Sequence, residues 1–325
     1  MRLFLSTLLV VVVGIPPTAR GDEDVSEGET KVDSPLARAF DPPGMDYPAA
    51  QTFGTGTSLY VDQTYETTGD LSTFTWVTGH GDNFRLAIGG TLRLWDLHLA
   101  IEVPLQYTRL HIDTLSGYDT ANQDRDKTAL SLGDVITGAS YLWGIPGHTI
   151  RWQIGAGLRA RLPTHTTEFT FTLVNGTPFT FGFPYYLHLA PELVFLATSR
   201  FLTVRIDQGV LGMFARDATI DNIRQHIPNL YFWESHYAAI AQPTQWFGFS
   251  VELVSCIQLN RVDDGGYTTL HNVRALMIEG GPAMDLGSYR ASVVGRLGLS
   301  HGAQDFGVIT FSGTSAVMGR LSYVF

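Results

Sequence analysis

The chain is poor in the residues that several common protein classes depend on. Its 325 residues include one cysteine, Cys256, so no internal disulfide can form and a disulfide scaffold is excluded. Charged residues make up only 16%, against about 25% in soluble domains, and just two of them are lysines. Acidic residues outnumber basic ones by 31 to 21, which argues against nucleic-acid binding. With 44% hydrophobic residues, the composition also excludes a disordered chain.

Long apolar runs are absent except at the N-terminus. Arg2 precedes an almost wholly apolar run over residues 3–15, and small residues follow as far as Gly21. This is the pattern of a cleaved secretory signal, predicted here as residues 1–21. The run is too short for a membrane helix, which needs about 20 apolar residues, and no later segment approaches that length without polar side chains. A secreted chain of this kind is either a soluble all-β protein or a membrane β-barrel.

Residues 22–50 differ in composition from the rest of the chain. They carry eight acidic residues against Lys31 and Arg38, together with four prolines. Such a segment cannot bury enough apolar surface to form a core, so it predicts a flexible acidic tail on the periplasmic side. The remaining residues, 51–325, form the predicted structured domain.

From about residue 53, apolar residues recur at every second position. Residues 84–94 are apolar at each even position, and residues 97–107 repeat the alternation after a tight turn at Trp95-Asp96. Period two is typical of β-strands and argues against helices. Several such segments run 10–14 residues, whereas a strand crosses a bilayer in about 9–11 residues. We therefore expect the apolar face to meet lipid and the polar face to line a barrel interior.

The alternation predicts an all-β transmembrane antiparallel up-and-down barrel in the bacterial outer membrane. The twelve expected strands lie near residues 54–66, 84–95, 97–109, 133–143, 149–162, 185–197, 200–211, 230–240, 245–259, 271–284, 289–300 and 316–325. Short links alternate with long polar links near 67–83, 110–131, 163–183, 212–229, 260–270 and 301–315, as in outer-membrane barrels. An even count leaves no open edge in lipid. Residues 230–240 and 271–284 alternate poorly, so ten or fourteen strands are the alternatives.

The last strand carries Leu321, Tyr323 and Phe325 on one face. This ending resembles the C-terminal assembly signal of Gram-negative outer-membrane proteins, which the barrel-assembly machinery reads. The expected partners are therefore that machinery, outer-membrane lipid and lipopolysaccharide.

A second resemblance lies in residues 97–143. The run Ser131-Leu132-Gly133-Asp134 opens an alternating strand, and the preceding strand contains Glu102-Val103-Pro104-Leu105. Both are similar to strands of the MetA-pathway phenol-degradation family. The resemblance implies an outer-membrane barrel that transports hydrophobic or aromatic compounds.

The charged residues on the polar phase are the candidate lining of the barrel interior. They are Arg85, Arg93, Glu102, Arg151, Arg159, Arg161, Glu192, Arg205, Asp207, Glu252, Arg290, Arg296 and Arg320. With Asp134 included, nine arginines stand against five acids. One interpretation is a basic channel that attracts anions. The other is a plugged interior in which arginine–carboxylate networks hold a narrow barrel rigid, an interpretation that the cross-strand placement of Arg85 and Glu102 favours.

Other kinds of site find little support. The sequence has no G-x-S-x-G motif, and Ser235 and His236 are adjacent in a strand, so they face opposite ways. The acidic loop with Asp119, Asn122, Asp124 and Asp126 does not match a calcium-binding loop. We predict no catalytic residue, no metal and no cofactor.

Three function classes remain from the sequence. The first is passive transport of a small apolar, aromatic or anionic compound. The second is a closed barrel with a structural or surface-exposed role, and the third and least favoured is an outer-membrane enzyme. The aromatic run over residues 178–184 fits an apolar lid over a pore mouth and a packed loop on the rim equally well.

Overall fold

The computed structural model describes the chain from residue 57 to residue 325, with gaps. The described ranges are 57–74, 77–115, 125–145, 150–164, 168–172, 175–182, 186–199, 201–215, 218–220, 223–225, 229–244, 246–260, 262–263, 269–270, 274–298 and 314–325. The predicted signal peptide and acidic tail lie outside these ranges. Among the described residues, no helix is long and apolar enough to span a membrane.

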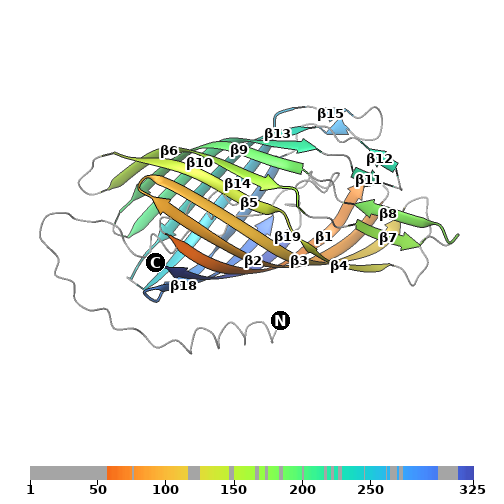
Figure 1. Cartoon of the computed structure of the whole chain (residues 1–325), viewed down its shortest axis with the longest axis horizontal. Helices are drawn as coiled ribbons and strands as arrows, with labels where there is room; N and C mark the ends of the chain where they lie inside the picture. The colour runs from red at the N-terminus through yellow and green to blue at the C-terminus, as the bar shows by residue number, and fades with distance from the viewer. Residues whose placement is uncertain are drawn as a thin grey trace, which may run out of the picture.

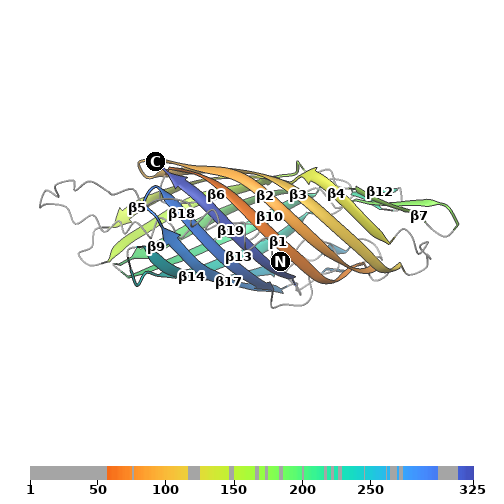
Figure 2. The same cartoon turned by 90° about the horizontal axis from the view of Figure 1, so that it is seen from below.

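Twelve antiparallel strands form a closed barrel in the described part of the chain (Figures 1 and 2). They are β1 (Ser58–Phe74), β2 (Val77–Leu94), β3 (Leu97–Leu115), β5 (Val135–Ile145), β6 (Arg151–Leu162), β9 (Tyr186–Thr198), β10 (Leu202–Ala215), β13 (Leu230–Ala241), β14 (Phe247–Gln258), β17 (Arg274–Asp285), β18 (Tyr289–Gly298) and β19 (Thr314–Val324). Each strand pairs with its neighbours in the chain, and β1 pairs with β19 to close the ring. The predicted up-and-down barrel of twelve strands is confirmed.

A β-bulge interrupts the wall where β4 (Asp126–Leu132) continues into β5. Strand β3 pairs with both, but Leu105 lies opposite Leu132 while Glu102 lies opposite Ile136, so the β4–β5 side holds one extra residue. The Gly133 amide donates to the Pro104 carbonyl at 2.8 Å. A Cβ at Gly133 would lie 2.8 Å from the Pro104 ring, which is why glycine suits this point. The bulge leaves the Asp134 side chain buried on the inner face.

The strands extend further at the long-loop end than the alternation predicts. The links expected at 67–83 and 110–131 are largely strand, since β1, β2, β3 and β4 run into them. Further short strands lie at this end: β7 (Glu168–Thr172), β8 (Pro178–Gly182), β11 (Ala218–Ile220), β12 (Ile223–Gln225), β15 (Val262–Asp263) and β16 (Thr269–Leu270). Those link predictions were wrong because both faces are polar beyond the bilayer, so the period of two disappears while the backbone pairing continues.

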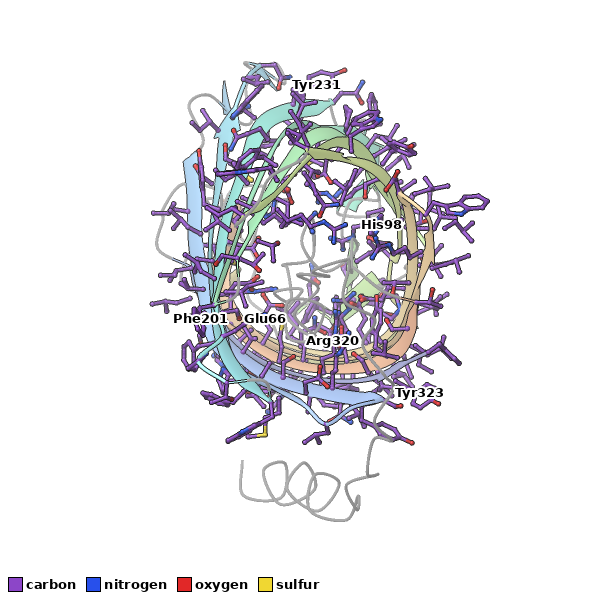
Figure 3. The ribbon with its side chains drawn as sticks, turned by 90° about the vertical axis from the view of Figure 1, so that its left-hand side faces the viewer. Glu66, His98, Phe201, Tyr231, Arg320 and Tyr323 are labelled. Carbon is purple, nitrogen blue, oxygen red and sulfur yellow. The ribbon has the colours of Figure 1, made fainter. Side chains whose placement is uncertain are left out.

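The outer wall is apolar. Ile88, Ile101 and Leu193 are more than half exposed, while residues one position away along the same strands are buried. Aromatic side chains gather near the short turns, including Trp95 in the two-residue β2–β3 turn. Figure 3 shows Phe201 and Tyr323 pointing outward and Arg320 and His98 pointing into the barrel. An apolar band with an aromatic girdle marks a lipid-facing surface, so the chain is a β-barrel of the bacterial outer membrane.

Candidate functional site in the barrel interior

All thirteen of the predicted lining residues lie on the inward phase of their strands. Glu102, Arg159, Glu192, Arg205, Asp207, Glu252, Arg290 and Arg296 are buried, and Arg85, Arg93, Arg151, Arg161 and Arg320 are partly buried. The ion pairs described below divide most of them among separate clusters on different strands. Which of them select a solute and which only pack the interior stays a prediction.

One cluster joins β19, β1, β2 and β3. Arg320 donates from Nε to the Asp62 carboxylate at 2.6 Å, and its guanidinium lies 4.1 Å from the centre of the Tyr60 ring. The Tyr60 hydroxyl donates to Glu102 at 3.1 Å, and Arg85 forms an ion pair with the same carboxylate. The expected pairing of Arg85 with Glu102 is therefore confirmed, and it belongs to a network that spans the closing seam of the barrel.

A second cluster crosses β6, β9, β13 and β14, and we call it the charged belt. Arg159 bridges two carboxylates, donating from Nε to Glu192 at 2.8 Å and from Nη2 to Glu234. His236 Nε2 lies 3.1 Å from Glu234, and its Nδ1 lies 2.7 Å from Glu252. All five side chains are buried. Arg159 and His236 thus link three carboxylates that come from three different strands.

Gly209 makes the reach of Arg159 possible. Gly209 belongs to β10 and lies directly between Glu192 on β9 and Glu234 on β13 in the register of the sheet. A Cβ at this position would lie 2.6 Å from the Pro191 carbonyl oxygen and 3.1 Å from Cβ of Glu192. Because glycine has no side chain, the inner surface of β10 is clear at this level, and Arg159 can bridge strands that are not neighbours.

Other arginines of the interior are also paired with carboxylates. Arg296 Nε lies 3.2 Å from Glu279, Arg205 Nε lies 2.9 Å from Asp207, and Arg161 Nε lies 2.7 Å from Asp134. Arg290 Nε lies 3.6 Å from Asp285. Most of the arginines in the predicted set are therefore held by carboxylates.

The structure adds acids that the sequence pattern did not reveal. Asp62, Glu66, Glu234, Glu279 and Asp285 are buried on the inward phase. With them, ten inward carboxylates stand against the nine predicted arginines and Lys127 on the inward phase of β4, which removes the positive excess expected from the sequence. Glu234 and Glu279 escaped notice because they lie in the two segments whose alternation was poor. The sequence held one signal of their position: each lies an even number of residues from other inward residues of the same strand.

Part of the interior is apolar. The inward residues of β10 to β19 on the long-loop side of the charged belt are buried and mostly aliphatic, and we call this surface the apolar inner wall. Its members are Leu211, Met213, Leu230, Phe232, Val254, Cys256, Met277, Ala316 and Met318. On the neighbouring strands β1 and β2 the inward residues are polar: Thr64 pairs in register with Met318 and with Arg85, and Glu66 pairs with Ala316. The apolar inner wall therefore ends at the closing seam of the barrel.

Ser235 and His236 lie on opposite faces of β13. Ser235 donates to Gln208 at 2.8 Å on the outer face, while His236 points inward, so the prediction that they do not pair is confirmed. No group of three or more His, Cys, Asp or Glu in the described ranges could hold a metal ion. Of the acidic loop, the described ranges include Asp126 at the outer rim. Its pKa is lowered by a hydrogen bond with His111 at 3.1 Å and by Arg109.

The C-terminal residues lie at the short-turn end. Tyr323 packs edge-on against Phe325 at 5.0 Å between ring centres and against Tyr289 at 5.2 Å, and both Tyr323 and Phe325 are exposed on the outer face. Leu321 is half-buried on β19. Their role in assembly stays a prediction.

Comparison with known proteins supports the fold. Residues 50–201 match the model of the family of the MetA pathway of phenol degradation, which confirms the resemblance drawn from residues 97–143. The crystal structure of the COG4313 outer membrane channel from Pseudomonas putida F1 aligns with a TM-score of 0.56 at 12% identity, covering 83% of this chain and 96% of that chain.

Two further solved structures are less similar. The transport unit of the autotransporter AIDA-I from Escherichia coli aligns with a TM-score of 0.49 at 8% identity, over 83% of this chain and 91% of that one. The CymD monoaromatic hydrocarbon channel aligns with a TM-score of 0.41 at 8% identity, over 83% and 88%. A search of curated proteins found no significant match.

Proposed function

We propose that the protein is a passive outer-membrane channel for a small apolar or aromatic solute, and not an enzyme. The observation that carries the proposal is the apolar inner wall, in which Leu211, Met213, Phe232 and Met277 face the interior of a membrane barrel. A purely aqueous pore gains nothing from such residues, whereas sites for small apolar ligands are lined by them. The similar Pseudomonas putida protein is described as a channel, and the matched family is named for phenol degradation.

The interior charges favour an apolar over an anionic solute. Ten carboxylates balance nine arginines and Lys127 at inward positions, so the predicted attraction of anions has no net charge to support it. We propose that Arg159, Arg296 and Arg320 chiefly hold the barrel wall, and that any selection of solute by charge depends on the carboxylates around them.

A closed barrel without transport is the second candidate, favoured by the burial of the charged belt. Arg159, Glu192, Glu234 and Glu252 are nearly inaccessible to solvent, as are the residues of the apolar inner wall, so the interior is constricted at both levels. A network of this kind holds a small barrel rigid.

The test is uptake by proteoliposomes that contain the full-length protein refolded and checked for heat-modifiable migration. We expect faster entry of 2-phenylethanol than in protein-free liposomes, together with a small ionic conductance in planar bilayers. Replacing Met213 or Phe232 with aspartate is expected to slow entry, because a charge in the apolar inner wall opposes an apolar solute. No difference from protein-free liposomes would favour the closed barrel.

We also propose a route to the membrane that matches this function. Residues 1–21 are a signal peptide, residues 22–50 an acidic periplasmic tail, and Leu321, Tyr323 and Phe325 the signal for the barrel-assembly machinery. The first of these is tested by mass spectrometry of the mature protein from a Gram-negative host. Its mass should be lower than that of the full sequence by the mass of residues 1–21.

A further inference from the structure

Two carboxylates of the interior directly face each other across neighbouring strands. Glu252 on β14 pairs in register with Glu279 on β17, and both side chains lie on the inward phase. Their exposed fractions are 0% and 2%. Directly opposed residues of an antiparallel pair lie about 4.5–5.5 Å apart at Cβ, and like charges there destabilise the sheet. The arrangement therefore calls for a compensating positive group.

Each of these carboxylates has one bonded and one unbonded oxygen. Glu252 Oε1 bonds His236 at 2.7 Å, and Glu279 Oε2 bonds Arg296 at 3.2 Å. The other two oxygens, Glu252 Oε2 and Glu279 Oε1, are buried and have no hydrogen-bond partner among the described residues. A buried carboxylate oxygen without a donor is costly, so this pair of oxygens is arranged to accept hydrogen bonds from something else.

The protein's own cations do not balance the local charge. The charged belt together with Glu279 and Arg296 holds four carboxylates, those of Glu192, Glu234, Glu252 and Glu279. Against them stand two arginines, Arg159 and Arg296, and His236. With His236 protonated and all four carboxylates ionised, one negative charge is left over. Arg205 and its partner Asp207 add one charge of each sign, so they leave this difference unchanged.

Apolar side chains adjoin the two carboxylates. Val254 and Met277 pair in register with each other. They lie one inward position closer to the long-loop end of the barrel than Glu252 and Glu279. Both are buried and belong to the apolar inner wall. A ligand that placed a positive head between the carboxylates could therefore lay an apolar body against Val254 and Met277.

We propose that Glu252 and Glu279 form a binding site for the ammonium head of a small apolar amine. An ammonium group has three donors and one charge, which match two unbonded carboxylate oxygens and one uncompensated negative charge. A bare metal ion fits less well, since no cluster of three metal-ligating side chains is found in the described ranges. The inference rests on the proposed channel function and narrows its solute class to cationic apolar molecules.

The test compares three probes that share a phenylethyl-like body. Binding of 2-phenylethylammonium, 2-phenylethanol and phenylacetate to the refolded full-length protein is measured by isothermal titration calorimetry in detergent. We expect the ammonium to bind at least about tenfold more tightly than the alcohol, the scale of a hydrogen bond to a charged group, and phenylacetate to bind most weakly. Glu252→Gln and Glu279→Gln should each abolish the preference for the ammonium.

Asp134→Asn is the matched control, because Asp134 is a buried inward carboxylate next to β5, six strands away from β17 around the barrel. It should keep the preference. Heat-modifiable migration and circular dichroism establish that each variant is folded, and either glutamine variant suffices if the other fails to fold. Equal binding of ammonium and alcohol by the wild-type protein, absence of ammonium binding, or an unchanged preference in a folded Glu252→Gln or Glu279→Gln variant would overturn the proposal.

The same probes separate this inference from the channel function. If 2-phenylethanol enters proteoliposomes faster than it enters protein-free liposomes but the ammonium preference is absent, the channel stands and the ammonium site fails. If no probe enters and the ammonium still binds with the expected preference, the site stands and the channel fails.

Discussion

Replacing Arg159 with methionine removes the cation on which the charged belt depends. The guanidinium bonds Glu192 at 2.8 Å and also pairs with Glu234, and the side chains of both acids are only 1% exposed. Methionine keeps most of the volume and none of the charge, so two carboxylates stay buried without their principal partner. Breaking a buried pair by removing one member typically costs about 3–5 kcal/mol. We expect a loss of free energy of unfolding in that range for Arg159→Met.

Arg109→Met is the matched control. Arg109 Nη2 lies 3.3 Å from Asp126, so the contact is of the same kind, but the side chains are 57% and 54% exposed at the outer rim. Water and salt screen such a pair, and exposed ion pairs contribute little to stability. The free energy of unfolding of this variant should match the wild type within error.

The assay is urea-induced unfolding in lipid vesicles, followed by tryptophan fluorescence and by heat-modifiable migration. A second variant separates charge from packing: in Arg159→Met/Glu234→Gln, one of the two stranded carboxylates is neutral, so part of the stability should return. Equal stability of Arg159→Met and Arg109→Met, or no recovery in the double variant, would refute the view that buried charge balance holds this wall together.

Three further predictions use single positions. Gly209→Ala should cost about 1–3 kcal/mol of unfolding free energy, because its Cβ meets the Pro191 carbonyl, whereas Gly295→Ala, with nothing within 4 Å, should be neutral in the same unfolding assay. Because the pKa of Asp126 is lowered in the fold, its contribution to stability is complete above the ordinary value of about 3.9 and is lost as the pH falls through the lowered value. Amide exchange in the β3–β4 pair should therefore rise over that pH range. The Asp126→Asn variant should show no such change. Phe325→Ala should reduce barrel assembly in cells and leave refolding from urea into vesicles unchanged.

The outer wall could be predicted from the sequence because lipid imposes one uniform demand. Every second residue of a spanning strand must be apolar, as in residues 97–107, and this requirement fixes both the strands and their approximate ends. All twelve strands expected from the alternation are present. The extensions beyond the bilayer were missed because water meets both faces there and no single-face pattern survives.

The interior could not be predicted in the same way, because its residues contact one another and do not all face the same solvent. Glu234 lies between inward Phe232 and His236, and Glu279 lies next to inward Met277, so neither strand shows a polar face. The pair Arg159–Glu234 joins positions 75 residues apart and depends on the register of four strands and on the bare surface at Gly209. Such contacts follow from the closed barrel and not from any local spacing.

The pairing of interior arginines with carboxylates changes what an arginine substitution there should do to ion selectivity. In a basic channel, replacing Arg296 with glutamine would weaken the attraction for anions. Here Arg296 is paired with Glu279 at 3.2 Å, so its removal exposes a carboxylate beside Glu252. We expect Arg296→Gln to shift the reversal potential in a salt gradient toward cations, and Arg296→Gln/Glu279→Gln to restore the wild-type value. A shift reproduced by the double variant would show that the arginine acts alone and that the carboxylates do not set the selectivity of the interior.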